Sequence, residues 1–268
     1  MAQPTIAAYG AHARQTLEIH RPPAGERPHH VFVFYHGGGW RSGSPRLYRF
    51  LGRALAKAGI LTVMPGYRLF PEARFPAFIE DSALALARVM DHIAAYGGQS
   101  DRLVIGGHSA GAHIAAHLAV DPAWLAPYER TPAALAGLLG MSGPYALNLA
   151  KYGRIGEAFK SAERPEAVRP DKRVLETGIA PPTLLLHGAR DPVVGTFNAI
   201  KFEAVLGSLG VPVACRLYGG AGHMLPVLAC HGALPTRLKS RMPVFEDMVR
   251  FIAQDGETRW PAKRTEAA

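Results

Sequence analysis

The chain has 268 residues, of which 48% are hydrophobic and 19% charged. This composition is ordinary for a globular protein and argues against a disordered, collagenous or membrane-spanning class. The formal net charge is +9. The basic residues are scattered, and their densest groups, at 237–241 and 263–264, lie beside no nucleic-acid-binding motif, so we expect a basic surface and no nucleic-acid partner.

Cysteine content and the N-terminal segment bear on the compartment. Cys215 and Cys230 are too few for a disulfide framework, and we expect two reduced thiols. The first fifteen residues carry neither the basic nor the apolar region of a signal peptide. No uncharged run approaches the roughly 18 apolar residues of a spanning helix. We therefore expect a cytoplasmic protein with no membrane association, and the sequence leaves a homodimer open.

Short apolar runs alternate with amphipathic segments along the chain. The pattern predicts strands at residues 31–35, 60–64, 103–106, 136–140, 183–187 and 213–218. It predicts helices at residues 44–57, 76–96, 110–120, 197–209 and 244–252. This alternation is typical of an α/β fold with a mostly parallel central sheet and helices on both faces.

Residues 146–180 interrupt the alternation, because they are polar, compatible with helix and free of a convincing strand. We expect a small cap-like insertion over the sheet edge, which is too short to be a second domain. The charged residues 254–268 are expected to form a flexible tail. Residues 1–268 are therefore predicted to be one domain.

Ser109 lies in the stretch Gly107-His108-Ser109-Ala110-Gly111, between a predicted strand and a predicted helix. A serine hydroxyl acts as a nucleophile when it is held out from the backbone beside a base. A sharp strand-to-helix turn does this, and it needs glycine two residues away on either side, where side chains would collide with neighbouring elements. The pattern predicts a catalytic nucleophile; the alternative is a tight turn without chemistry.

A glycine-rich segment, His36-Gly37-Gly38-Gly39-Trp40, follows the first predicted strand. Its backbone N–H groups can face a developing oxyanion without a Cβ in the way. A phosphate-binding loop would continue with Lys-Ser/Thr or open a helix with G-x-G-x-x-G, and this segment does neither. We therefore predict that it binds an oxyanion.

A base and a carboxylate are expected after Ser109, in the order Ser…Asp/Glu…His. Asp191 follows the predicted strand 183–187, and His223 follows the predicted strand 213–218. Both loops open at the carboxyl ends of parallel strands, as do Ser109 and the glycine-rich segment. Asp191 and His223 are therefore the predicted partners of Ser109.

Other titratable residues fit these roles less well. His113 and His117 lie four residues apart on one predicted helical face, but no third metal ligand is evident and packing is the preferred interpretation. His187 is interpreted as structural, and His108 is expected to point away from the site. The remaining candidates lie out of order or away from a strand end: Asp81, Glu203 and His231.

These motifs together resemble the α/β-hydrolase superfamily, in its esterase branch with an HGGG loop, over about residues 15–253. Tyr67-Arg68-Leu69 with Pro71-Glu72 and residues 75–77 (FPA) is similar to a segment of hormone-sensitive-lipase-like esterases. The Gly-His-Ser-Ala-Gly-Ala-His run and Ser142-Gly143 are closer to kynurenine-formamidase-like and feruloyl-esterase-like bacterial members. The hormone-sensitive-lipase-like enzymes usually carry an N-terminal cap and an Asp where this chain has Gly66.

The resemblance implies an acyl-enzyme mechanism on a small ester or amide, with no cofactor and no metal. Ser109, Asp191 and His223 would form the triad, and the N–H groups of Gly38, Gly39 and Ala110 would hold the oxyanion. An apolar wall suited to an aryl or short acyl group is expected from Trp40, Tyr67, Tyr145 and Met224. Esters are the preferred substrates. Arylformamide hydrolysis, the reaction on N-formylkynurenine, is the alternative, and a non-catalytic binding protein is a more remote one.

Overall fold

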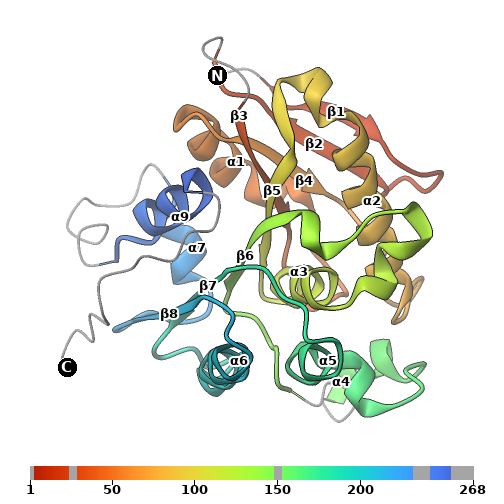
Figure 1. Ribbon diagram of the computed structural model, residues 1–268, viewed down its shortest axis with the longest axis vertical. Coiled ribbons are helices and arrows are strands. Elements are labelled where there is room, and N and C mark those ends of the chain that lie inside the picture. The colour runs from red at the N-terminus through yellow and green to blue at the C-terminus, as the bar shows by residue number, and fades with distance from the viewer. Residues whose placement is uncertain (1–2, 24–28, 148–152, 232–241, 255–268) are drawn as a thin grey trace.

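An eight-stranded sheet forms the centre of the molecule (Figure 1). The computed structural model describes residues 3–23, 29–147, 153–231 and 242–254. In the sheet the strands run in the order β1-β2-β4-β3-β5-β6-β7-β8. Their bounds are β1 Thr5–Ala8, β2 Thr16–His20, β3 His29–Tyr35, β4 Leu61–Pro65, β5 Gly98–His108, β6 Leu135–Met141, β7 Thr183–Gly188 and β8 Val213–Tyr218.

Strands β3 to β8 are parallel to one another, whereas β2 is antiparallel to both β1 and β4. The main helices are α1 Arg49–Lys57, α2 Ala77–His92, α3 Ala110–Val120, α5 Pro170–Thr177, α6 Phe197–Ser208 and α9 Val244–Ala253, with single turns α4 Gly153–Gly156 and α7 Leu225–Leu228. The predicted mostly parallel α/β fold is confirmed.

Alternate residues of β3 enter two separate apolar cores. Val31, Val33 and Tyr35 pack in one core, and Phe32 and Phe34 pack in the other. All five are fully buried. A strand that is covered by helices on both faces must be apolar at every position, which explains the unbroken run Val-Phe-Val-Phe-Tyr.

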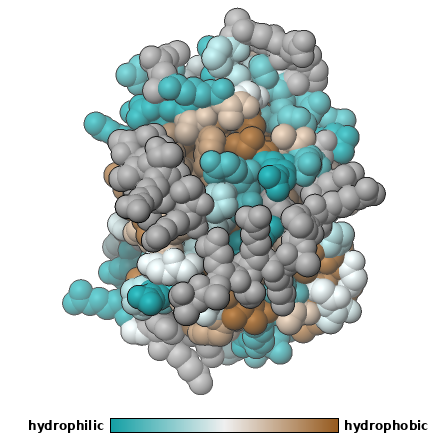
Figure 2. Space-filling view, turned by 90° about the vertical axis from the view of Figure 1, so that its left-hand side faces the viewer, coloured by the Kyte–Doolittle hydropathy of each residue, from teal (hydrophilic) through white to brown (hydrophobic). Residues whose placement is uncertain are grey.

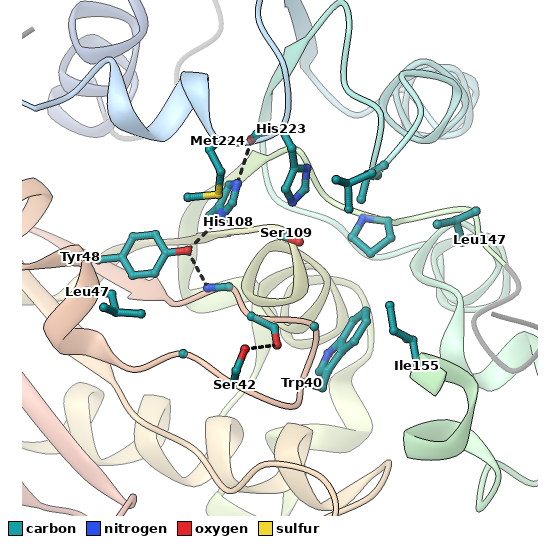
Figure 3. A pocket seen from close by; sticks show the side chains of 17 residues that line it. Trp40, Ser42, Leu47, Tyr48, His108, Ser109, Leu147, Ile155, His223 and Met224 are labelled. Carbon is teal, nitrogen blue, oxygen red and sulfur yellow. Dashed lines mark hydrogen bonds between the residues drawn. The ribbon is translucent and has the colours of Figure 1, made fainter. Parts of the chain in front are cut away.

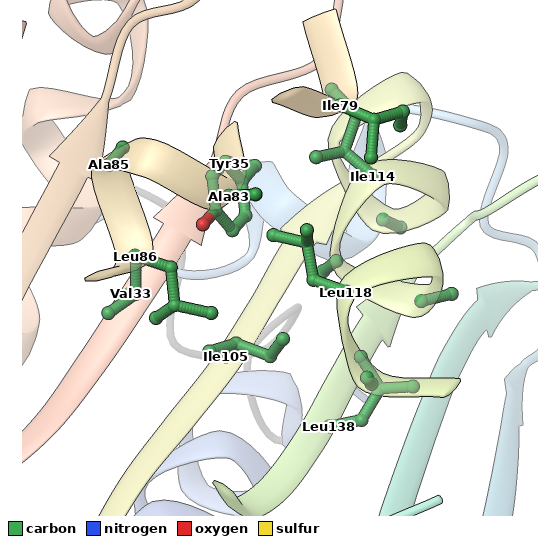
Figure 4. Packing of buried hydrophobic residues seen from close by; sticks show 14 of the residues in the cluster. Val33, Tyr35, Ile79, Ala83, Ala85, Leu86, Ile105, Ile114, Leu118 and Leu138 are labelled. Atoms are coloured by element: carbon green, nitrogen blue, oxygen red, sulfur yellow. The ribbon is translucent and has the colours of Figure 1, made fainter. Parts of the chain in front are cut away.

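Helices α2 and α3 cover the first face of the sheet. There Val33, Ile105 and Leu138 of three neighbouring strands lie beneath Leu86 of α2 and Leu118 of α3 (Figure 4). Burying an aliphatic side chain of this size contributes about 1.5–3 kcal/mol. This packing fixes α3 against the middle of the sheet, and with α3 it fixes Ser109, the residue just before the helix.

Helices α1, α7 and α9 cover the second face. Leu51 and Leu55 of α1 pack there with Met248 and Phe251 of α9. On the outer surface of this side, hydrophilic and hydrophobic residues are interspersed (Figure 2). In the part of the chain that the structure describes, no helix is both long and apolar enough to cross a membrane.

Most predicted elements lie where the sequence pattern placed them. The helix at 110–120 and the strand at 213–218 match in full. Two helices are shorter than predicted: a 3-10 turn, Pro45–Tyr48, precedes α1, and another, Ile93–Tyr96, follows α2. The two N-terminal strands β1 and β2 were not predicted.

The predicted insertion at 146–180 is described at residues 146–147 and 153–180, and this part holds α4, α5 and 3-10 turns with no strand. It is attached to the body by hydrogen bonds from His113 Nε2 to the Val168 carbonyl (2.9 Å) and from Arg173 Nε to Asp121 (2.9 Å). Residues 148–152 lie outside the described part, and so does the predicted tail from residue 255 onward.

Candidate active site

Ser109 stands between β5 and α3 in a strained backbone conformation, with φ 54° and ψ −118°. The two flanking glycines explain how the turn closes. A Cβ on Gly111 would lie against the carbonyl oxygens of Tyr35 and His36, and one on Gly107 would lie against the backbone of Gly111. The strand–turn–helix context of the G-x-S-x-G pattern is therefore present, and the free N–H groups at the start of α3 lie behind the serine.

Asp191 and His223 are brought together by the loops after β7 and β8. His223 Nδ1 donates to Asp191 Oδ2 at 2.8 Å, while the N–H groups of Val193 and Val194 donate to Oδ1, each at 2.9 Å. The Asp191 side chain is fully buried. Burial by itself would raise the pKa of Asp191, but the hydrogen bonds from Val194, His223 and Val193 outweigh it and lower that pKa.

Ser109 and His223 both line the same pocket (Figure 3). No direct hydrogen bond joins the Ser109 hydroxyl to the His223 ring within the described residues. Nucleophile and base are often separated in an unliganded site and approach each other when substrate binds. With Nδ1 donating to Asp191, the Nε2 atom of His223 is free to accept a proton.

The glycine-rich segment after β3 is held by side chains that bind its carbonyl groups. Tyr67 donates to the carbonyl of His36 at 2.7 Å, and His36 Nδ1 donates to the carbonyl of Gly37 at 2.8 Å. In a trans peptide the C=O and the following N–H point in opposite directions. The bond to the Gly37 carbonyl therefore turns the N–H of Gly38 away from His36.

The next peptide is held more firmly. The carbonyl of Gly38 accepts from the N–H of Arg41 (3.1 Å), from the N–H of Ser42 (3.0 Å) and from the Ser42 hydroxyl (3.0 Å). The Gly39 N–H consequently faces away from Ser42. Three consecutive residues here have positive φ: Gly38 at 129°, Gly39 at 60° and Trp40 at 58°. Both glycines line the pocket, where their N–H groups can meet an oxyanion.

The pocket has a volume of about 320 Å³. Of the four predicted wall residues, Trp40 and Met224 line it. The Trp40 ring is packed edge-on against Phe159 (4.8 Å between ring centroids), which makes it a fixed wall. Met224 is 45% exposed and lies at the mouth. The other apolar or aromatic side chains of the wall were not predicted: Leu47, Tyr48, Pro144, Leu147, Ile155, Val193 and Val194.

The prediction that Tyr67 and Tyr145 line the pocket does not match the structure. Tyr67 is fully buried beneath the glycine-rich segment, where its ring stacks on His36 at 4.2 Å. Tyr145 turns into the core and stacks on Phe202 at 4.8 Å. Both rings are buried against another ring, which removes more of their apolar surface from water than a place in the open pocket wall would.

His108 was expected to point away from the site, but it lines the pocket and lies against His223, with ring centroids 4.8 Å apart. No spacing in the sequence indicates this contact, since it depends on the fold alone. His187 is buried and its Nε2 donates to the Val194 carbonyl at 2.8 Å, which suits the predicted structural role. His113 and His117 are also buried, packed ring to ring at 4.5 Å.

Known proteins similar to this chain include α/β hydrolases. A family model described as the alpha/beta hydrolase fold matches residues 32–151. The chain is 29% identical over 235 residues to the probable isoprenylcysteine alpha-carbonyl methylesterase ICMEL1 of Arabidopsis thaliana, covering 80% of this chain and 49% of that protein. It is 31% identical over 235 residues to esterase LipQ of Mycobacterium tuberculosis, covering 78% and 54%.

The chain thus spans about half the length of these curated relatives. Among solved structures, esterase 2 of Thermogutta terrifontis, phosphoramylated by tabun, superposes with a TM-score of 0.79 at 22% identity over 96% of each chain. At that identity the likeness concerns the fold. From the matched family, the relatives and the HGGG loop in its place after β3, this chain belongs to the α/β-hydrolase superfamily, in its HGGG-type branch.

Proposed function

We propose that the protein hydrolyses small, uncharged carboxylic esters through an acyl-enzyme intermediate. The observation that carries the proposal is the buried Asp191 hydrogen-bonded to His223 at 2.8 Å, in the pocket that also exposes Ser109 at a strand–helix elbow. Nucleophile, base and orienting carboxylate come from three separate loops at one end of the sheet. Both relatives are named as esterases, and this supports the same reaction class.

In the first step the Ser109 hydroxyl oxygen attacks the ester carbonyl carbon while His223 Nε2 takes the hydroxyl proton. The carbonyl electrons move to oxygen, and the N–H groups of Gly38, Gly39 and Ala110 stabilise the resulting oxyanion. When the intermediate collapses, the bond to the alkoxy group breaks and His223 returns the proton to the leaving alcohol. A water then repeats the sequence on the acyl-enzyme and releases the acid.

Asp191 fixes the tautomer of His223, and this role gives a first prediction. In Asp191→Asn the amide oxygen still accepts from the N–H groups of Val193 and Val194, so the loop keeps its shape. The amide N–H₂ then faces His223 Nδ1, which places the ring proton on Nε2 and blocks proton uptake. We expect kcat to fall about 10⁴-fold, with Tm nearly unchanged. Steady-state kinetics and thermal unfolding measure both, and a kcat near that of the wild type would contradict the assignment.

The pocket wall favours a neutral acyl or alkoxy group. Apart from Ser42, His108 and His223, the side chains around Ser109 are apolar or aromatic, and Trp40, Leu147 and Ile155 belong to this set. Moving a charged group from water into such surroundings costs free energy. A volume of about 320 Å³ is at the lower end for ligand pockets. We therefore expect acetyl to butyryl esters to be preferred over long-chain esters.

The test is a series of p-nitrophenyl esters from acetate to decanoate, with Ser109→Ala purified in parallel as the control for contaminating esterases. Removal of a triad nucleophile costs about 10⁶ in kcat. A fluorophosphonate probe should add one mass increment, located at Ser109 by peptide mass spectrometry. Hydrolysis that survives in Ser109→Ala, or labelling at another residue, refutes the mechanism.

The same assay separates the related substrates. N-formylkynurenine tests the amide alternative, and its charged amino-acid group should enter the apolar pocket poorly. The methyl ester of an isoprenylcysteine tests the reaction named for the Arabidopsis relative. The cytoplasmic location remains a prediction from the sequence, which leaves a homodimer open.

A further inference from the structure

A chain of three hydrogen bonds runs from the glycine-rich segment to the loop of His223 (Figure 3). The N–H of Gly37 bonds to the Tyr48 hydroxyl at 3.2 Å, the hydroxyl bonds to His108 Nδ1 at 3.0 Å, and His108 Nε2 bonds to the backbone carbonyl of His223 at 3.1 Å. The two interior groups come from the turn before α1 and from the end of β5. The chain therefore joins three loops that meet at the pocket.

The direction of each bond follows from the groups at its ends. The carbonyl of His223 can only accept, so His108 Nε2 carries the ring proton and Nδ1 is an acceptor. The Tyr48 hydroxyl must then donate to Nδ1, which leaves its oxygen to accept from the Gly37 N–H. Each of the three contacts therefore has one donor and one acceptor, with a single hydrogen between them.

Burial keeps both interior groups neutral. It lowers the pKa of His108 to about 4 and raises the pKa of Tyr48 to about 12. A neutral His108 matters because its ring lies 4.8 Å from that of His223, which becomes positively charged during acyl transfer. A charged neighbour would oppose that step, whereas a neutral donor holds the same loop without opposing it.

We propose that Tyr48 and His108 are positioning residues for acyl transfer, holding the loop of His223 and the oxyanion-binding segment at a fixed separation on either side of Ser109. This inference rests on the proposed esterase function. We call this chain of three hydrogen bonds the bridge. His108 directly precedes Ser109, so the bridge ties the base to the elbow that carries the nucleophile. It also uses the Gly37 N–H, which leaves the N–H groups of Gly38 and Gly39 for the oxyanion.

The packing around the bridge shows that the glycine-rich segment is fitted to it. A Cβ on Gly37 would lie 2.9 Å from both His108 Nδ1 and the Tyr48 hydroxyl, so a larger residue would displace them. The Tyr48 ring has separate support, since it packs on Phe34 with centroids 5.1 Å apart. Phenylalanine at position 48 would keep this packing and lose only the two hydrogen bonds.

The main test compares Tyr48→Phe with Tyr9→Phe. Tyr9 is equally buried and its hydroxyl donates to the Gly66 carbonyl at 2.6 Å, outside the pocket lining. For Tyr48→Phe we expect kcat on p-nitrophenyl butyrate and the rate of fluorophosphonate labelling of Ser109 to fall about tenfold, with KM within about twofold. Tyr9→Phe should lose thermal stability only.

His108 provides a second variant and a coupling measurement. In His108→Leu the same loss of kcat is expected, and the Tyr48→Phe/His108→Leu double variant should be about as slow as the slower single variant, because one chain is broken either way. His108→Gln, whose amide can still donate to the His223 carbonyl, should recover part of the rate. If Tyr48→Phe does not fold, the two His108 variants decide the question on the same readouts.

Three results would overturn the proposal: wild-type kcat in both Tyr48→Phe and His108→Leu, multiplicative losses in the double variant, or an equal loss in Tyr9→Phe. Failure of the proposed function is distinguishable from these. In that case the wild-type protein itself neither hydrolyses the esters nor reacts with the fluorophosphonate at Ser109.

Discussion

Ser42 illustrates how a single side chain can set the direction of a backbone N–H group. Its hydroxyl and its own N–H both bind the Gly38 carbonyl, each at 3.0 Å, and the opposite end of that peptide is the Gly39 N–H. The hydroxyl therefore acts on the proposed oxyanion site through the Gly38–Gly39 peptide. Its position, four residues after Gly38, is visible in the sequence, but its orientation is not.

We expect Ser42→Ala to reduce kcat about threefold to tenfold with little change in KM, because one of three bonds to the Gly38 carbonyl is lost and the loss of a whole oxyanion donor costs about 10²–10³. Ser208→Ala is the matched control, since the Ser208 hydroxyl also donates to a backbone carbonyl, that of Val205 at 2.7 Å, far from the pocket. Equal kinetics in the two variants would argue against a role for Ser42.

Among single residues, the sequence indicated those that belong to a recognisable pattern. Ser109, Asp191 and His223 follow from the elbow, the strand ends and the order along the chain, and the structure brings Asp191 and His223 together. No pattern indicates the contact between His108 and Tyr48, because it joins residues 60 positions apart. Aromatic character alone could not decide whether Tyr67 or Tyr145 faces the pocket or the core.

At the level of elements, strands buried on both faces were the easiest to predict. The run at residues 31–35 of β3 is aliphatic or aromatic at every position. By contrast, β1 and β2 are four and five residues long and mix Thr, Glu and His with aliphatic residues. These two strands extend the sheet beyond β4 in antiparallel pairing. Such short, mixed segments are specified by the edge that they pair with rather than by their own periodicity.

The elbow between β5 and α3 allows a test on glycine. Gly111→Ala would place a Cβ against the backbone of β3, where neither side can yield, and we expect loss of the folded protein or of its activity. Gly207→Ala in α6 is the control, because nothing lies within 4 Å of the added Cβ. That change should stabilise the protein by about 0.5–1 kcal/mol. Expression yield, Tm and esterase rate measured together distinguish the two, and a fully active Gly111→Ala would contradict the close packing.

For the molecule as a whole, buried histidines link stability to pH. Burial lowers the pKa of each: to about 4 for His20, His36 and His108, to about 3 for His117, and well below the usual value for His113. In the unfolded chain these groups titrate near 6.5. Below that pH the unfolded chain therefore binds more protons than the folded one, which favours unfolding.

We therefore expect the free energy of unfolding to be nearly independent of these histidines above about pH 6.5 and to fall as the pH decreases from 6.5 towards 4. His117→Leu removes one such group from an aromatic core and should make the fall between pH 7 and pH 5 shallower. His92→Gln, at an exposed position, should leave the slope unchanged. Urea unfolding at the two pH values measures the slopes, and parallel slopes in wild type and His117→Leu would exclude the effect.

The bridge through Tyr48 and His108 also bears on the order in which the protein becomes active. One of its bonds spans 115 residues, from β5 to the loop after β8. Contacts between distant parts of a chain form late, since the intervening segment must first be ordered. The pocket is therefore complete only when the last parallel strand has joined the sheet, and we expect a refolding chain to gain helices before it gains the ability to turn over an ester. Catalytic rate is thus a stricter measure of correct folding in this protein than secondary-structure content.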